Sequence, residues 1–415
     1  MPSINLLNTF WRSNGASIAS NRLFNALKST SDIRFICSDN IENNSFTISQ
    51  NFAQKIRKTN DKLERFTLQF TIKDISYLSR FSSANVGFPP RLMKNLYNTD
   101  IIHLHWLNQG FISLRGLKKI IRSGKPIVWT LHDMWAFTGG CHYTSKCSGF
   151  LSSCGNCPML RNPSSSDLSS IIFKRKYNIY KDANINIVTC SNWLKEKAQN
   201  SALLANKNVI SIPNPINTEL YKPIDKKQAK EKLKLPENKR YILFASGNIF
   251  DKRKGIKFLV DAFRQLAFNK NKHLENTEIL LFGKAAEGIK SLFPVKVNYL
   301  GILKSEETII NAYNAADVFV LPSLEDNLPN TIMEALSCGV PCLAFNSGGI
   351  PEMIKHKETG YLAQHKSSDD LAEGLSWILD SDIEELSKNA RQFVLDNYSE
   401  DVVAEKYMSL YKSLI

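Results

Sequence analysis

Two carboxylates, Asp326 and Glu334, lie eight residues apart in the segment 322–341. The segment follows a short apolar run, passes through an acidic loop and takes on a helical pattern near Pro329. Ligands of open α/β sheets bind at the carboxyl ends of strands, and the free N–H groups of a helix N-terminus bind phosphate. The spacing therefore predicts one carboxylate in the loop and the other one turn into the helix, where they could bind sugar and ribose hydroxyls beside a diphosphate. An acidic helix N-terminus without a ligand is the alternative.

A basic turn at 251–255 follows the apolar run 241–245. Its sequence, DKRKG, places Arg253 and Lys254 directly before a glycine, and Asn248 stands between the run and the turn. Cations at the end of a strand suit a phosphate-bearing ligand. A solvated basic turn is the alternative interpretation.

Polar residues also follow apolar runs in the first half of the chain. His132 and Asp133 come directly after the run 127–131, and Gly15 follows the opening run 4–7. A side chain at the carboxyl end of a strand is placed to contact a ligand. We expect this of His132 and Asp133, although a lone histidine is more often structural and a glycine more often makes a turn.

Two more histidines, His103 and His105, alternate within the run 101–106 and so face the same side of a strand. They either line an acceptor site or belong to the core.

In this order along the chain, the motifs resemble those of retaining, family-4 glycosyltransferases of the GT-B fold, including bacterial exopolysaccharide and lipopolysaccharide enzymes of the colanic-acid type. Asp326 stands where the first acid of the family's E-x7-E signature is usually a glutamate, and Glu334 matches the second acid. Lys254 matches the family's phosphate-binding lysine. The resemblance covers nearly the whole chain and is strongest over 241–361.

The sequence departs from the family pattern at two places. Asn248 stands where an arginine is usual, so Arg253 or Lys252 would supply the second positive charge. Glu325 adjoins Asp326, which leaves open which of the two acids contacts the donor sugar.

The resemblance implies an α/β protein of two facing Rossmann-like, doubly wound domains with an interdomain cleft. The implied reaction moves a sugar from a nucleotide diphosphate sugar to a saccharide or lipid-linked saccharide acceptor, with retention of configuration and without a catalytic metal. The implied catalytic residues are His132, Lys254, Asp326 and Glu334, and the implied substrate-binding residues are Gly15, Asp133, Asn248, Arg253, Glu325, Asn330 and Thr331.

Other functions fit parts of the sequence. A sugar-nucleotide epimerase or a phosphorylase would share the fold, and a basic nucleic-acid-binding protein would explain the net charge of +14. The chain has no recognisable nucleic-acid motif, however, and we expect no nucleic-acid partner. It also lacks G-x-G-x-x-G and G-x-x-x-x-G-K-[ST], which disfavours a nicotinamide dehydrogenase and a P-loop NTPase.

Apolar runs typical of strands alternate with helical stretches along the chain, which indicates parallel α/β architecture. A Pro- and Asn-rich stretch near 213–223 marks the boundary between two such domains. We therefore expect an acceptor-side domain at 1–215 and a nucleotide-sugar domain at 216–399. A last helix at 400–415 would cross back to the first domain.

The positive charge lies in the first half of the chain. Residues 1–215 hold 27 Lys and Arg against 11 Asp and Glu, whereas residues 216–415 hold 26 against 28. The segment 52–95 mixes basic and apolar residues and could bind an anionic membrane surface, although ordinary solvated lysines would look the same. Without a secretory signal or a long apolar stretch, we expect a cytoplasmic protein, peripheral at the inner face of the cell membrane.

Four of the eight cysteines cluster in a Gly- and Ser-rich segment at 136–160. Cys141, Cys147, Cys154 and Cys157 are separated by five, six and two residues. They form either a structural zinc site, which would stabilise an irregular loop, or four reduced thiols packed in it. The other four cysteines are expected to be buried as small apolar side chains.

Overall fold

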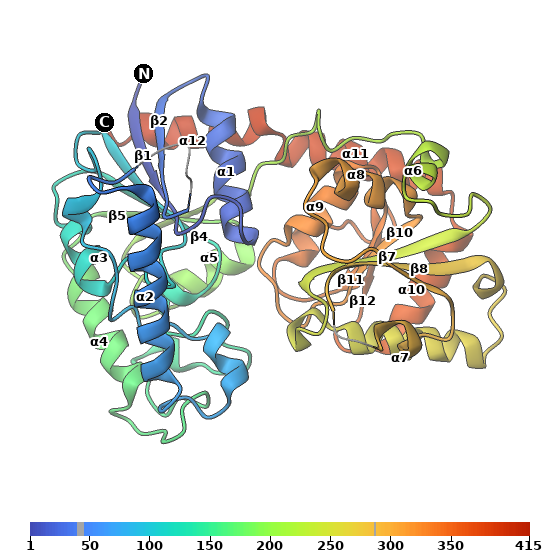
Figure 1. Ribbon diagram of the computed structural model, residues 1–415, viewed down its shortest axis with the longest axis horizontal. Helices are drawn as coiled ribbons and strands as arrows, with labels where there is room; N and C mark the ends of the chain where they lie inside the picture. The colour runs from blue at the N-terminus through green and yellow to red at the C-terminus, as the bar shows by residue number, and fades with distance from the viewer. Residues whose placement is uncertain (40–44, 286–287) are drawn as a thin grey trace. The chain divides into compact units, whose positions relative to one another are not determined.

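The computed structural model describes residues 1–39, 45–285 and 288–415. They form two compact α/β units (Figure 1). The first, unit 1, comprises Met1–Asn214 and Val403–Ile415, and the second, unit 2, comprises Pro215–Val402. The division falls one residue before the expected boundary, and the C-terminal residues belong to unit 1.

Unit 1 is built on a six-stranded parallel sheet in the order β2-β1-β3-β4-β5-β6. Its central strands are buried along their whole length, because helices cover both faces of a parallel sheet. The order reverses between β1 and β3, which is the switch point where doubly wound sheets bind ligands. The strands are β1 (Ser3–Leu7), β2 (Asp32–Ile36), β3 (Ile101–Leu104), β4 (Ile127–Leu131), β5 (Ile185–Thr189) and β6 (Asn208–Ser211).

The helices of unit 1 are α1 (Gly15–Leu27), α2 (Gln50–Leu68), α3 (Leu114–Ile121), α4 (Leu168–Tyr180), α5 (Asn192–Gln199) and most of α12 (Glu400–Lys412). Each of the first five begins after a residue whose side chain accepts a hydrogen bond from an amide of the first turn. These capping residues are Asn14, Ser49, Ser113, Asp167 and Ser191. None of the described helices is long and apolar enough to cross a membrane.

Unit 2 contains a second six-stranded parallel sheet, in the order β12-β11-β10-β7-β8-β9. Its order reverses between β7 and β10, which are neighbours in the sheet. The strands are β7 (Arg240–Asn248), β8 (Thr277–Lys284), β9 (Val297–Tyr299), β10 (Val318–Leu321), β11 (Cys342–Phe345) and β12 (Gly360–Ala363).

The helices of unit 2 are α6 (Lys226–Lys232), α7 (Ile256–Phe268), α8 (Glu306–Ala315), α9 (Asn330–Ser337), α10 (Ser368–Asp380) and α11 (Ile383–Tyr398). The helices α7 and α9 follow the two strands at the switch point, and neither has a side-chain cap at its start. Their first N–H groups are therefore directed toward the carboxyl edge of the sheet, where an anion would bind.

The sequence does not predict one strand of this sheet. The strand β12 (Gly360–Ala363) has only four residues, yet it pairs in parallel with β11 along its whole length. This pairing requires a glycine at position 360, because the Cβ of any other residue would lie 2.0 Å from the backbone oxygen of Cys342.

Candidate active site

The switch point of unit 2 brings together three of the predicted donor-binding residues. Arg253 and Lys254 lie in the turn after β7, and Asp326 lies in the loop after β10. Lys254 Nζ is 2.6 Å from Asp326 Oδ2, and Arg253 Nη1 is 3.0 Å from Asp326 Oδ1. Ser323 Oγ donates a third hydrogen bond to the same carboxylate, at 3.1 Å. We call Arg253, Lys254 and Asp326 the cation–carboxylate cluster.

Electrostatics keep the Asp326 carboxylate ionised. Burial alone raises its pKa, but the charges of Arg253 and Lys254 and their hydrogen bonds outweigh burial and hold the pKa well below its usual range. The same burial lowers the pKa of Lys254, while Asp326 opposes that shift. Arg253 also lies 3.8 Å from the carboxylate of Asp251, so the two cations are held between two acids at the end of β7.

Two glycines let the backbone close around this cluster. Gly255 has φ +74°, and a Cβ there would lie 1.9 Å from the carbonyl oxygen of Pro322. Gly348 has φ +61°, and its Cβ would lie 2.0 Å from the carbonyl oxygen of Asp326. The N–H of Gly349 donates to that same oxygen at 3.0 Å. Any side chain at these glycines would push apart the turn and the loop that hold the charged groups.

The second acid of the pattern, Glu334, lies just past the first turn of α9. It is 7% exposed, and its Oε2 accepts a hydrogen bond of 2.8 Å from the hydroxyl of Tyr313. Asn330 and Thr331, the first two residues of α9, are half-buried. One carboxylate thus precedes the helix and one lies inside it, as the spacing predicts.

Two further predicted substrate-binding residues lie at the ends of the same strands: Asn248 is the last residue of β7, and Glu325 is in the loop after β10. Asn248 is exposed at the end of β7, and its side chain accepts a hydrogen bond from the N–H of Phe250. Glu325 contributes its carbonyl oxygen to Arg253, at 2.8 Å. The adjacent acid, Asp326, binds both cations through its carboxylate.

In unit 1, His132 follows β4 and contacts a second predicted histidine. His132 Nε2 lies 2.9 Å from His105 Nδ1, and the two rings stack at 5.2 Å. Burial lowers the pKa of His132 to about 4 and that of His103 to about 3. Burial also lowers the pKa of His105, whose Nε2 has no hydrogen-bond partner among the described residues. The three rings are therefore held neutral, and His132 is the half-buried one.

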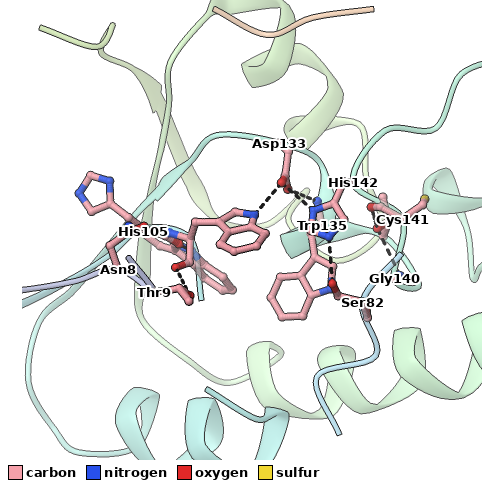
Figure 2. A network of polar contacts seen from close by, with 12 residues as sticks. Asn8, Thr9, Ser82, His105, Asp133, Trp135, Gly140, Cys141 and His142 are labelled. Atoms are coloured by element: carbon pink, nitrogen blue, oxygen red, sulfur yellow. Dashed lines mark hydrogen bonds and ion pairs between the residues drawn. The ribbon is translucent and has the colours of Figure 1, made fainter. Parts of the chain in front are cut away.

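Asp133 is the centre of a separate polar network (Figure 2). Its Oδ2 accepts from Trp106 Nε1 at 3.0 Å and lies 2.7 Å from His142 Nδ1. His142 Nε2 in turn lies 3.0 Å from Ser82 Oγ. Burial raises the pKa of Asp133, but its contacts with His142, with the N–H of Trp135 and with Trp106 outweigh burial. The pKa therefore lies below its ordinary value. Asp133 thus anchors the irregular loop that follows it.

The sequence predicted Asp133 but not its partners. His142 lies in a stretch with little regular structure, so no periodic spacing relates it to a residue nine positions earlier. Trp106 ends an apolar run and has the pattern of a strand residue. The one signal available was the position of Trp106 and Asp133 just after the ends of β3 and β4.

The C-terminal helix α12 contributes hydrogen-bond partners to these strands. Tyr411 OH lies 2.7 Å from His103 Nδ1, and Tyr407 OH lies 2.9 Å from Thr130 Oγ1. Thr130 Oγ1 is also 2.8 Å from His103 Nε2. Both ring nitrogens of His103 therefore have partners, and its role in unit 1 is to bind α12.

Gly15 is exposed at the first position of α1. The residue before it, Asn14, caps the helix: its side chain accepts from the N–H of Ser17, and Ser17 Oγ accepts from the N–H of Asn14. The capping role explains why the residue at position 14 is an asparagine.

The cysteines are all free. Cys37, Cys190, Cys338 and Cys342 are buried, as predicted. Cys141, Cys147, Cys154 and Cys157 line one small cavity in unit 1.

Comparison with known proteins matches both halves of the chain. The family described as Glycosyltransferase Family 4 matches residues 60–220, and the family described as Glycosyl transferases group 1 matches residues 225–393. The chain is 23% identical over 389 residues to the putative colanic acid biosynthesis glycosyl transferase WcaC of Escherichia coli K12, covering 88% of each protein.

Other relatives match over shorter stretches. The N-acetyl-alpha-D-glucosaminyl L-malate synthase of Bacillus anthracis is 26% identical over 51% of this chain, and the match spans about half (55%) of that protein. The UDP-Gal:alpha-D-GlcNAc-diphosphoundecaprenol alpha-1,3-galactosyltransferase of Escherichia coli is 26% identical over 49% of this chain and 62% of its own length.

Solved structures share the whole fold. Sucrose-phosphate synthase from Thermosynechococcus elongatus superposes with a TM-score of 0.69 at 19% identity, covering 100% of this chain and 99% of its own. Anabaena HepE, solved in complex with UDP-glucose, gives 0.62 at 15% identity and covers 100% of both chains.

Two doubly wound units, each with polar side chains at the carboxyl ends of its strands, define the GT-B class. Two family matches cover most of the chain, one in each unit. The protein belongs to the family-4 type of GT-B glycosyltransferases.

Proposed function

We propose that the protein moves a sugar from a nucleotide diphosphate sugar to a saccharide or lipid-linked saccharide acceptor, with retention of configuration. The observation that carries the proposal is the cation–carboxylate cluster at the switch point of unit 2, next to the uncapped N-terminus of α9. This is the environment that a departing nucleotide diphosphate requires.

Each group of the cluster has a task in this reaction. Lys254 and Arg253, with the N–H groups of Asn330 and Thr331, stabilise the negative charge that develops on the diphosphate as the glycosidic bond breaks. Asp326 holds both cations in place and presents its carboxylate to the donor sugar. Glu334, further along α9, binds the ribose hydroxyls.

The environment of the two acids favours a front-face transfer, in which the acceptor attacks from the side that the diphosphate leaves. A double displacement needs a carboxylate nucleophile. Asp326 is a weak nucleophile because its charge is shared with two cations, and Glu334 is bound by Tyr313. Nuclear magnetic resonance of the first-formed product would determine its anomeric configuration, and inversion would refute retention.

His132 acts in this scheme as a neutral hydrogen-bonding group toward the transferring sugar. Its low pKa, about 4, keeps it uncharged at neutral pH. His105, at 2.9 Å, fixes the orientation of its ring.

The names of two relatives support an envelope polysaccharide as the product. One is a putative colanic acid biosynthesis enzyme, and another acts on a sugar linked to diphosphoundecaprenol. We infer that the acceptor of this protein is also carried on a lipid diphosphate, so that the enzyme works at an anionic membrane surface.

The helix α2 supports this location. It buries polar side chains: Arg57 Nη1 donates to the carbonyl of Gln109, and Glu64 accepts from the N–H groups of Ser83 and Ala84. Its exposed surface carries large apolar side chains between lysines. These are Phe52, Leu63 and Phe66 of α2 and Phe70 just past its end, which are 49–60% exposed, and Lys55, Lys58 and Lys62. Aromatic rings between cations suit an anionic lipid surface.

A thermal-shift screen against UDP-, GDP- and dTDP-sugars tests the proposal, because a ligand of the folded state raises the melting temperature. We expect one donor to raise it, and product to form only when a saccharide or lipid-linked acceptor is added. Turnover of the donor to an epimer without acceptor would identify an epimerase. Release of a sugar phosphate from a saccharide by inorganic phosphate would identify a phosphorylase.

A further inference from the structure

The segment after Asp133 contains a feature that sugar transfer does not use. Cys141, Cys147, Cys154 and Cys157 come from separate points of a stretch whose regular structure is two short 3-10 turns, Trp135–Phe137 and Gly149–Leu151. All four nevertheless line one cavity of about 20 Å³. That volume holds one water molecule or one ion.

The loop backbone packs closely around these thiols. A Cβ at Gly149 would lie 3.6 Å from Cys147 Sγ and 3.9 Å from Cys154 Sγ. The N–H of Gly139 points at Cys154 Sγ from 3.2 Å. Donation of a backbone N–H to sulfur is weak for a thiol but strong for a thiolate.

A buried lysine lies beside the same cavity. Lys176 of α4 is fully buried; its Nζ donates to the carbonyl oxygens of Thr138 and Trp135 and lies 3.7 Å from the centre of the Trp135 ring. No carboxylate lies within ion-pair distance of it in the part of the chain that the structure describes. Burial lowers its pKa to about 7, while Cys141, Cys154 and the more distant carboxylate of Asp133 oppose the shift.

Four sulfur atoms around one ion-sized cavity are the ligand set of a structural zinc site. A zinc ion with four thiolate ligands has a net charge of −2, and the buried ammonium of Lys176 and the N–H of Gly139 would balance part of it.

We propose that Cys141, Cys147, Cys154 and Cys157 bind one structural zinc ion, with Lys176 and the N–H of Gly139 balancing its thiolate charge. Each thiol releases its proton to solvent as its sulfur binds the metal. In the described residues no three His, Cys, Asp or Glu side chains are already arranged around one ion. Zinc binding therefore includes rotation of the thiols into the cavity that they line.

The ion would hold the loop that completes the Asp133 network. Cys141 directly precedes His142, whose ring contacts Asp133 at 2.7 Å. With four protein ligands the metal keeps no open position, so its role is to stabilise the loop and not to bind substrate.

Metal analysis of the full-length protein, purified without added metal, tests the proposal. We expect one zinc per chain, lost in Cys147→Ser and Cys154→Ser but kept in Cys37→Ser, a buried cysteine of unit 1 outside the loop. Removal of the ion by a chelator should lower the melting temperature, and added zinc should restore it. Cobalt substituted for zinc should give the absorption of a tetrahedral thiolate complex.

The cobalt spectrum and the zinc content of the wild-type protein do not depend on the variants folding. Four titratable free thiols without zinc, in a protein that neither a chelator nor added zinc affects, would overturn the proposal. So would stoichiometric iron in place of zinc.

Discussion

Lys254 Nζ lies 2.6 Å from Asp326 Oδ2, although the two residues are 72 positions apart in the chain. The pair joins the turn after β7 to the loop after β10, the two strands at which the order of the sheet reverses. Each group depends on the other: the cation keeps the carboxylate ionised, and the carboxylate fixes the position of the cation. This mutual dependence makes the pair the most informative place to change the protein.

Replacing Lys254 by alanine should lower kcat by about 10²–10³, the effect of losing one group that stabilises developing negative charge. The fold should persist, because Arg253 still pairs with Asp326 at 3.0 Å. Steady-state kinetics with the donor found by the thermal-shift screen measure the effect, and circular dichroism checks the fold. Lys257→Ala, an exposed lysine at the start of α7, is the control and should retain wild-type turnover. Near-normal turnover of Lys254→Ala would refute the assigned role.

The closeness of Gly348 to Asp326 gives a second prediction. Alanine at Gly348 combines a positive φ with a Cβ 2.0 Å from the Asp326 carbonyl, so the loop must move. Alanine at Gly124 has a similar φ of +80° but no atom within 4 Å, so it shows the cost of backbone strain alone, about 1 kcal/mol. We expect Gly348→Ala to lower the free energy of unfolding by at least about 2 kcal/mol more, measured by urea unfolding. If both variants lost the same free energy of unfolding, the contact with Asp326 would not contribute to stability.

The strands show how far the sequence determines the fold. The bounds of β4 coincide with the predicted run 127–131, because a fully buried parallel strand is a nearly continuous apolar run. The strand β12 has only four residues and begins at a glycine, so its local pattern resembles a turn. Its pairing with β11 determines its structure.

The site was predictable in its members but not in its contacts. Resemblance to a family placed Lys254 and Asp326 at one ligand, but no spacing rule predicts that they bind each other. The orientation of α2 is a similar case. Its apolar pattern does not show which face is buried, and the backbone groups of Gln109 and Ser83, outside the strands, bind the face with Arg57 and Glu64.

The buried histidines of unit 1 predict acid sensitivity. Their pKa values in the folded protein are about 3 for His103 and about 4 for His132, below the ordinary value of 6.5. Between pH 6.5 and 4 the unfolded chain therefore binds more protons than the folded one, and the free energy of unfolding should fall as the pH is lowered through this window. Asp326 loses its contribution only below pH 4, because its folded pKa is well below the usual range.

Urea unfolding followed by tryptophan fluorescence at pH 7 and pH 5 measures this effect. Five of the six tryptophans lie in unit 1, so the signal reports mainly on that unit. His103→Gln should reduce the difference between the two pH values. A free energy of unfolding that stays constant from pH 7 to pH 5 would contradict the prediction.

The hydroxyl of Tyr411 binds α12 to the sheet of unit 1 through His103. Tyr411→Phe leaves the buried His103 Nδ1 without this partner and should lower the free energy of unfolding by about 1–3 kcal/mol. Tyr177→Phe, which removes a hydroxyl from a tyrosine that is 51% exposed, should change it by less than about 0.5 kcal/mol. Equal stability of the two variants would show that the hydrogen bond between Tyr411 and His103 does not help to hold α12.

Co-sedimentation with lipid vesicles tests the role of α2. Phe66 of α2 and Phe70, two residues past its end, are 58% and 60% exposed and have ring centroids 5.2 Å apart. Lys62 lies one helical turn before Phe66. Phe66→Ser with Phe70→Ser should weaken binding to anionic vesicles several-fold, since both rings lose their insertion into the lipid. Replacing the three lysines of α2 by glutamine should remove the dependence on anionic lipid and on salt.

The control for the aromatic variants is Phe268→Ser, which changes a phenylalanine that is 88% exposed at the end of α7 in unit 2. It should bind vesicles as the wild type does, because α2 and its lysines are intact. If wild-type binding were insensitive to salt and to the anionic lipid content, the electrostatic part of the proposal would be wrong. If Phe268→Ser weakened binding as much as the α2 variants, the membrane-facing surface would have to include unit 2. Loss of binding confined to the α2 variants would assign the positive charge of the first half of the chain to a membrane surface.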